Sequence, residues 1–271
     1  MDALLTAVLL LACYAPLLVD LARQWSTDPD MSHGFLVLPV AAFVAWRRRA
    51  EIAAALRESD RVPNWWGLAI AVWGAVQMLL GTLAAQVFVA RTAFLVSVTG
   101  AVLFLGGRRA LKTLAFPLLL LLFLFPIPAI VYARITLPLQ IFASAAAETV
   151  LNGVGIPVLR EGNILELPHE RLSVVEACSG IRSLLSLGFL ALVYSYFFDQ
   201  RVRMRWVLLA ATVPIAIAAN AARVTLMGIL GEYHAGMAYG GFHLLESWVL
   251  FLVALSLLIA VHRCLALRRL S

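Results

Sequence analysis

The sequence predicts an all-α, polytopic integral membrane protein. Hydrophobic residues make up 63% of the 271 residues and charged residues only 13%, whereas a soluble protein of this size carries roughly a quarter charged residues. The apolar residues occur in runs of about twenty, the length that a helix needs to cross a bilayer, and not in a helical or strand alternation. An ordinary soluble domain is therefore a poor alternative.

About eight apolar runs are candidates for transmembrane helices. The second run is short, and Trp46 together with the arginine residues after it would anchor this span at the membrane interface. The candidate spans cover roughly residues 3–22, 34–47, 66–84, 87–105, 113–130, 178–198, 206–226 and 244–262.

Clusters of basic residues between the spans set the expected topology. A net charge of +6 can indicate nucleic-acid binding in a soluble protein, but no stacking platform accompanies these clusters, so no nucleic-acid partner is expected. Basic loops of membrane proteins stay in the cytoplasm. We therefore expect both termini inside, with the loops at 48–64, 106–112 and 199–205, and the loops at 23–33, 155–177 and 227–243 outside.

The amino terminus and the cysteines carry no processing, disulfide or metal signal. Residues 1–25 lack a basic region and a small-residue cleavage site, so we expect a retained first span. Cys13, Cys178 and Cys264 are too few and too scattered for a disulfide framework, and they form no metal-type pair. Cys13 is expected to pack within a span, and Cys264 lies in the basic tail.

The segment between the fifth and sixth spans is expected to lie at the outer interface. Residues 135–154 are long enough to cross, but a crossing would reverse the topology of the basic clusters that follow, so we expect an interfacial helix. The loop at 155–177 contains short alternating runs broken by turn residues, which predict a small extracytoplasmic hairpin. No internal repeat or low-complexity linker is present, so a single domain over residues 1–271 is expected.

This topology brings three reactive residues to one membrane face. Cys178 begins the sixth span from outside, Arg223 lies near the outer end of the seventh, and His243 opens the eighth from outside. Three separate spans would therefore deliver a cysteine, an arginine and a histidine to a similar depth.

Two features of its surroundings would activate Cys178 as a nucleophile. A helix N-terminus and a nearby arginine both lower a thiol pKa from about 8.5, and Cys178 has both nearby. Ser179 and Gly180 form a compact turn whose free backbone N–H groups can also receive an oxyanion. Arg182 lies four residues after the cysteine and hence on the same helical face.

His243 and Arg223 would take the remaining roles. A histidine can accept the thiol proton or give a proton to a leaving amine. Arg223 stays protonated, so its role would be to hold the thiolate or the oxygen of a tetrahedral intermediate, with Asn220 one turn earlier as a supporting donor. Glu176 and Glu246 are candidates to orient these groups.

Simpler interpretations exist for each residue alone. A lone cysteine at the end of a span usually packs, and a lone histidine or arginine near an interface usually anchors the helix, but charged groups inside spans are costly and point to function. His169, His234 and His262 lie in outer loops or at the inner end of the last span. No HExxH or CxxC spacing, P-loop or dinucleotide fingerprint occurs, so no metal and no cofactor are expected.

At these residues the sequence resembles the exosortase/archaeosortase family of integral-membrane cysteine transpeptidases. The resemblance implies that Cys178 is the nucleophile, that Arg223 stabilises the thiolate or transition state, that His243 is the third catalytic member and that Arg182 is a further active-site residue. It covers nearly the whole chain and rests on EACSGIRS (Glu176 to Ser183), NAARV (Asn220 to Val224), FHLLESW (Phe242 to Trp248) and SHGFLVLP (Ser32 to Pro39).

The resemblance also implies the substrates and the setting. Expected substrates are exported proteins whose carboxy-terminal sorting signal contains a Pro-Glu-Pro motif, a transmembrane helix and a basic tail. Expected partners are these membrane-anchored proteins, the lipid bilayer and exopolysaccharide machinery. The expected location is a bacterial inner membrane, with the active site on the extracytoplasmic face. Some relatives carry a further domain after the membrane core, whereas this chain stops at Ser271 and is expected to be a core-only form.

Two functions from other classes remain open. A transporter or flippase could use Arg182, Arg223 and Glu148 as a polar path, although polar groups gather at one face and no inverted repeat is evident. A non-catalytic assembly factor for exopolysaccharide export would tolerate the loss of Cys178.

Overall fold

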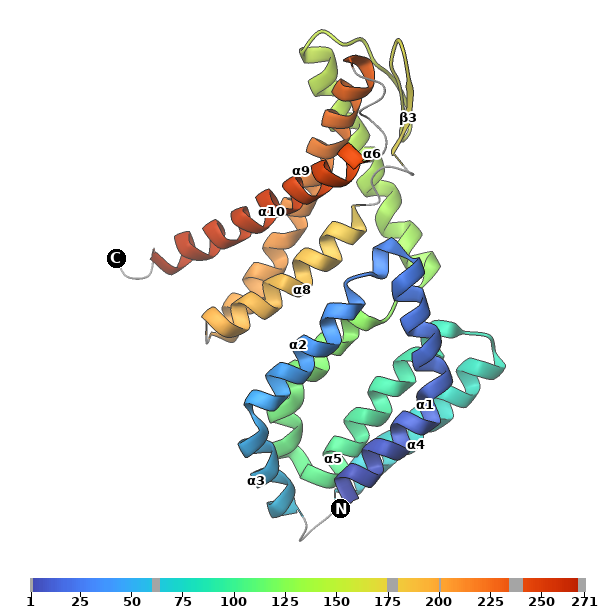
Figure 1. Cartoon of the computed structure of the whole chain (residues 1–271), viewed down its shortest axis with the longest axis vertical. Coiled ribbons are helices and arrows are strands. Elements are labelled where there is room, and N and C mark those ends of the chain that lie inside the picture. The colour runs from blue at the N-terminus through green and yellow to red at the C-terminus, as the bar shows by residue number, and fades with distance from the viewer. Residues whose placement is uncertain (1, 60–63, 175–179, 200, 234–240, 268–271) are drawn as a thin grey trace. The chain divides into compact units, whose positions relative to one another are not determined.

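The computed structural model describes the chain except residues 1, 60–63, 175–179, 200, 234–240 and 268–271. Within the described residues, seven helices are long and apolar enough to cross a membrane, which confirms the prediction of an all-α polytopic membrane protein. The chain divides into two compact units, Met1–Pro128 and Ala129–Ser271, and each is described by itself (Figure 1).

Helices that follow the predicted spans make up the first unit. The short second span is a helix over the predicted residues, and Asn64 begins the third span by accepting a hydrogen bond from the Trp66 N–H at 3.1 Å. The elements are α1 (Asp2–Thr27), η1 (Pro29–Met31), α2 (Gly34–Arg47), α3 (Arg49–Ser59), α4 (Trp65–Leu83), α5 (Val87–Leu120) and η2 (Leu121–Leu124).

Helix α5 consists of two arms that reverse direction at Gly107. Gly107 has φ 61° and ψ −165°, a backbone conformation that a glycine adopts readily. Two adjacent residues of α1 contact positions far apart in the sequence. Gln24 accepts a hydrogen bond from Arg91 in the first arm, and Trp25 Nε1 donates to the Leu124 carbonyl, just after the second arm, at 3.1 Å. A straight helix would place residues 91 and 124 about 50 Å apart. The two contacts therefore require a hairpin, as the separate spans predicted over 87–105 and 113–130 imply.

The backbones of α4 and the first arm of α5 lie in close contact. A Cβ atom on Gly67 would lie 2.2 Å from the Phe104 backbone nitrogen, and one on Gly100 would lie 2.3 Å from that of Ala71. Small residues of this kind allow membrane helices to approach closely. Tyr14 of α1 joins the same layer, because its hydroxyl lies 2.8 Å from Ser97 Oγ.

A small sheet and four helices make up the described part of the second unit. The strands pair antiparallel in the order β1-β2-β3, so the hairpin predicted in the 155–177 loop is present and extended by a third strand. The elements are α6 (Ala129–Gly153), β1 (Leu159–Glu161), β2 (Ile164–Glu166), β3 (Arg171–Ser173), α8 (Ile181–Phe198), α9 (Val202–Tyr233) and α10 (Gly241–Leu267).

Helix α6 contains the segment that was expected to lie at the interface, and it runs parallel to α9. It has 25 residues and is apolar enough to cross a membrane by length and composition, so neither property distinguishes it from the other spans. Leu139 lines a cavity with Ala216, and Leu151 lies beside Gly228. The residue numbers rise together in the two helices, from Leu139 beside Ala216 to Leu151 beside Gly228, so the helices run in the same direction. The carboxyl end of α6 therefore lies near the carboxyl end of α9, where the sheet also lies.

Two apolar cores hold the second unit together at its two ends. Near the sheet, Leu165 and Val174 pack with Leu151 of α6 and Val224 of α9. Farther along the bundle, a second core joins three helices: Leu187 and Ala191 of α8, Leu208 of α9, and Ala254 and Leu258 of α10. The three helices that follow or carry the predicted catalytic positions are therefore packed against one another.

We predict that Gly67→Ala destabilises the first unit, because the added methyl group would push α4 away from the α5 backbone. Such overpacking costs about 1–3 kcal/mol, although alanine is the better helix former by about 1 kcal/mol. The matched control is Gly153→Ala, since a Cβ there would meet nothing within 4 Å. Thermal unfolding in detergent should show a lower midpoint for Gly67→Ala only. Equal midpoints would contradict the close approach of the two helices.

Candidate functional site

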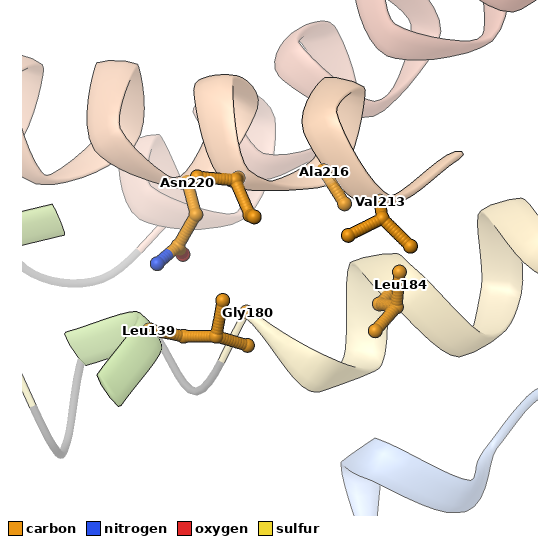
Figure 2. A pocket seen from close by; sticks show the side chains of 7 residues that line it. Leu139, Gly180, Leu184, Val213, Ala216 and Asn220 are labelled. Atoms are coloured by element: carbon orange, nitrogen blue, oxygen red, sulfur yellow. The ribbon is translucent and has the colours of Figure 1, made fainter. Parts of the chain in front are cut away.

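The start of α8 lies against α9 through a glycine and an asparagine. Gly180 has φ 63° in the left-handed region, and a Cβ there would lie 3.2 Å from the Asn220 side chain. Figure 2 shows the Asn220 amide pointing toward Gly180 across a cavity of about 20 Å³, a volume that suits one water-sized group. The first N–H groups of a helix have no intrahelical acceptors, and Gly180 has no side chain that could cap those of α8.

Arg223 lies one turn after Asn220, in a second small cavity between three helices. Ser183 of α8, Asn220 and Arg223 of α9, and Leu250 of α10 all line it. The guanidinium is therefore placed where the first turns of α8 and the first half of α10 meet α9. The three spans around Arg223 are those that the predicted topology brings together, and the catalytic role of Arg223 stays a prediction.

Three polar atoms near this meeting point are buried without a hydrogen bond from the described part of the chain. They are Asn220 Oδ1, Arg223 Nε and Glu246 Oε1. Glu246 is 5% exposed and lies close enough to Arg223 for the two charges to attract. Buried polar groups are normally paired, so this cluster has the capacity to bind a further polar group.

Part of the predicted site lies outside the described residues. Cys178, Ser179 and Glu176 fall within residues 175–179, and the side chain of His243 is likewise outside them, although its backbone belongs to the first turn of α10. Their predicted roles therefore stay predictions. Arg182, on the first turn of α8, is exposed and does not line either small cavity.

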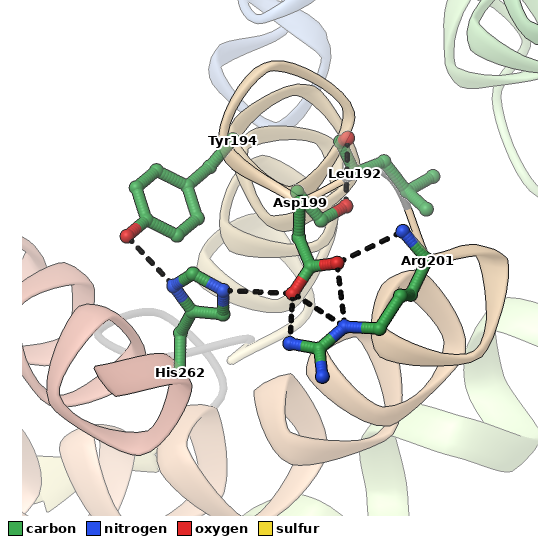
Figure 3. A network of polar contacts seen from close by, with 6 residues as sticks. Leu192, Tyr194, Asp199, Arg201 and His262 are labelled. Carbon is green, nitrogen blue, oxygen red and sulfur yellow. Dashed lines mark hydrogen bonds and ion pairs between the residues drawn. The ribbon is translucent and has the colours of Figure 1, made fainter. Parts of the chain in front are cut away.

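A polar network joins the same three helices at the other end of the bundle (Figure 3). Asp199, directly after α8, accepts from Arg201 Nη2 at 2.6 Å and lies 3.2 Å from His262 Nε2. His262 Nδ1 in turn lies 3.0 Å from the Tyr194 hydroxyl. Because the carboxylate only accepts, Nε2 donates to it, and a neutral ring accepts from Tyr194 at Nδ1. The sequence predicted only that His262 lies at the inner end of the last span. The residue is 8% exposed, and both of its ring nitrogens form hydrogen bonds.

The charge of Asp199 makes this network sensitive to pH. The side-chain hydrogen bonds from Arg201 hold the pKa of Asp199 well below its ordinary value, with further help from the Arg201 backbone N–H and His262. A lowered pKa contributes stability above the unfolded value of about 3.9. That contribution is lost as the pH falls from there through the folded-state pKa.

We predict that Asp199→Asn lowers the unfolding free energy at pH 7 by about 1–3 kcal/mol, because Arg201 and His262 lose their shared acceptor. The difference from the native protein should narrow as the pH falls below about 4, since protons then bind the Asp199 carboxylate of the unfolded chain and favour unfolding of the native protein only. Thermal unfolding at each pH measures this. Asp20→Asn, at a side chain 66% exposed and 3.8 Å from Arg23, should change little. A gap that does not depend on pH would contradict the role of the Asp199 charge.

Two buried polar residues of the first unit were not identified as site residues from the sequence. Arg91 is 9% exposed and donates to Gln24, and His33 is 7% exposed with Nε2 3.1 Å from the Phe123 carbonyl. Burial lowers the pKa of His33 below its ordinary value, so the neutral ring donates from Nε2. A charge within an apolar run was the available signal for Arg91, and the SHGFLVLP motif was the signal for His33.

The described residues contain no group of three or more His, Cys, Asp or Glu side chains that could hold a metal ion. The polar groups gathered near the small cavities are Arg223, Asn220, Glu246 and the helix start at Gly180. Together they offer a cation, an amide, a carboxylate and the N-terminus of a helix. These are the elements that bind and stabilise a developing negative charge.

Comparison with known proteins agrees with the resemblance found in the sequence. The family described as transmembrane exosortase (Exosortase_EpsH) matches residues 25–260. No curated protein and no solved structure matches the chain. The matched region covers most of the chain and includes the helix start at Gly180, Arg223 and the first turn of α10. The chain therefore belongs to the transmembrane exosortase family.

Proposed function

We propose that this protein is a membrane cysteine transpeptidase or protease. It cleaves the carboxy-terminal sorting signal of exported proteins, a Pro-Glu-Pro motif followed by a transmembrane helix and a basic tail. Cys178 acts as the nucleophile, Arg223 stabilises negative charge and His243 transfers the proton. Asn220 and the backbone N–H groups after Ser179 support the oxyanion, and Glu176 and Glu246 orient the charged groups.

The observation that carries this proposal is the cavity lined by Ser183, Asn220, Arg223 and Leu250. Ser183 lies five residues after Cys178, and Leu250 lies seven residues after His243. The three chain segments that carry the proposed catalytic residues therefore approach one another around Arg223. Membership of the exosortase family adds independent support, because this is a protease-like transpeptidase family.

The first half of the proposed reaction releases the tail of the substrate. The Cys178 thiolate attacks a peptide carbonyl carbon next to the motif, forming a C–S bond and placing negative charge on the carbonyl oxygen. Arg223, Asn220 and the N–H groups at the start of α8 stabilise that charge. When the intermediate collapses, the C–N bond breaks and His243 gives a proton to the leaving amine. A thioester on Cys178 and a free tail fragment result.

The second half of the reaction transfers the protein to an acceptor. An amine of the cell envelope, or water, attacks the thioester carbonyl while His243 accepts a proton from it, and the C–S bond breaks to return the thiolate. The partial burial of Arg223, whose Nε atom is shielded from solvent, supports this use of its charge. Outside water, a guanidinium acts more strongly on a nearby oxyanion than it would in solvent.

The membrane itself would position the substrate. A sorting signal whose own helix spans the bilayer presents its motif at a fixed depth near the extracytoplasmic face, which supplies proximity without a deep soluble cleft. We place the enzyme in the bacterial inner membrane, with both termini in the cytoplasm. Exopolysaccharide machinery is a proposed partner of the exported product.

We predict that Cys178→Ala abolishes processing of a co-expressed reporter that carries a Pro-Glu-Pro sorting tail, because the nucleophile is gone. The rate should fall about a thousand-fold or more, measured by gel shift and mass spectrometry. The matched controls are Cys13→Ala and Cys264→Ala, since both thiols are free and exposed, and both should process normally.

Processing that survives Cys178→Ala would contradict the proposal. It would instead favour a non-catalytic assembly factor, or a transporter in which the buried charges line a path. A transporter would still depend on Arg223, and its activity would not depend on any cysteine.

We predict that Arg223→Lys slows processing about a hundred-fold, because lysine keeps the charge but loses the planar fork that can donate to an oxyanion and an orienting group together. Arg203→Lys is the matched control, since Arg203 is exposed on the same helix. Single-turnover rates with the same reporter measure the effect. Equal rates for both variants would remove Arg223 from the chemistry.

A further inference from the structure

An apolar groove in the first unit is not used by the proposed reaction. It has a volume of about 320 Å³ and is lined by residues of α1, α3 and both arms of α5. Ala7 and Leu11 of α1, Leu56 of α3, Phe94 and Ala101 of the first α5 arm and Ala110 of the second are among them. Leu11 at its edge is 54% exposed, so the groove is open on the side of α1.

The walls of this groove are suited to hydrocarbon. Apart from Thr6, the lining residues are aliphatic or aromatic. The groove lies beside the hairpin at Gly107 and beside α3, which belong to loops that the basic residues place in the cytoplasm. It is therefore expected at the level of the inner leaflet, where lipid acyl chains surround the helices.

Basic residues adjoin several of the lining residues along the chain. Arg57 directly follows the lining residue Leu56, Arg109 directly precedes Ala110, and Lys112 lies between Ala110 and Leu114. These side chains and that of Arg108 are exposed, and the nearby exposed carboxylate of Glu51 only partly offsets them. We call Arg57, Arg108, Arg109 and Lys112 the basic rim.

From this combination we propose that the groove binds one anionic phospholipid of the inner leaflet. An acyl chain fills the space between α1, α3 and α5, and the negatively charged headgroup lies against the basic rim. Basic pockets between transmembrane helices on the cytoplasmic side bind anionic headgroups in this way. The lipid joins α3 to both arms of the α5 hairpin, so it stabilises the folded unit by mass action. This inference does not depend on the proposed peptidase activity.

The test uses the delipidated full-length protein in a neutral detergent. Dioleoyl-phosphatidylglycerol or dioleoyl-phosphatidylcholine is added stepwise, with native mass spectrometry to count bound lipids and tryptophan fluorescence to follow thermal unfolding. The anionic lipid should bind with a stoichiometry of one and raise the unfolding midpoint, and the zwitterionic lipid should bind at least ten-fold more weakly. Soluble glycerol phosphate should give no shift, because it lacks the acyl chains.

Two kinds of variant separate the headgroup from the acyl chain. Combining Arg108→Gln, Arg109→Gln and Lys112→Gln should weaken phosphatidylglycerol binding at least ten-fold, whereas Arg203→Gln with Arg263→Gln, two exposed basic positions of the other unit, should not. Ala7→Trp should fill the groove and reduce binding similarly, with Ala75→Trp at an exposed position of α4 as its control. Equal affinity for both lipids, or equal binding by the rim variant and its control, would overturn the proposal.

Discussion

The second unit depends on one constraint: the buried side chains of Asn220 and Glu246 and the half-buried Arg223 lie within an apolar helical bundle. An isolated charge among transmembrane helices is costly, so such groups pair, face a polar cavity or serve a function. Here a cation and a carboxylate attract each other, yet each retains an atom without a hydrogen bond from the described residues. Buried polar atoms without hydrogen bonds lower the stability of the folded protein. This cost is understandable if a reacting group forms hydrogen bonds with these atoms.

The rest of the second unit holds these groups in place. Gly180 allows α8 to begin directly against Asn220, because its left-handed backbone and missing Cβ permit a close approach that a larger residue would prevent. The apolar core that includes Leu187, Leu208 and Ala254 then fixes the three helices along their length. At the far end, Asp199 and His262 join the end of α8 to the end of α10. The position of Arg223 is thus determined by packing on one side and by hydrogen bonds on the other.

Much of the fold could be predicted from the sequence because membrane helices obey simple rules of length and charge. The limits of α2 and the small sheet near Arg160 follow directly from apolar runs and turn residues. The Asp199–His262 contact could not be predicted, since it joins residues 63 positions apart that carry no shared motif. The depth at which α6 lies is equally hard to predict, because its length and hydropathy suit a span while its polar residues suit an interface.

For the site, two independent rules single out Arg223 in the sequence, and its catalytic role stays a prediction. The predicted topology brings the second half of α9 to the start of α8, and an arginine inside an apolar run indicates function. Glu246 could be named only as a candidate, since its closeness to Arg223 depends on the rotation of α10 about its axis, which hydropathy does not fix. The burial of His33 and Arg91 could not be predicted, because their partners are a backbone carbonyl and a glutamine side chain.

The most direct test of the central claim is to look for the covalent intermediate itself. The purified enzyme would be mixed with a sorting-signal reporter, quenched in acid at successive times and examined by intact mass spectrometry with peptide mapping. The account predicts a transient adduct on Cys178 with the mass of the reporter lacking its tail, which hydroxylamine removes as expected for a thioester. Complete processing of the reporter with no adduct on Cys178 at any time would contradict the account.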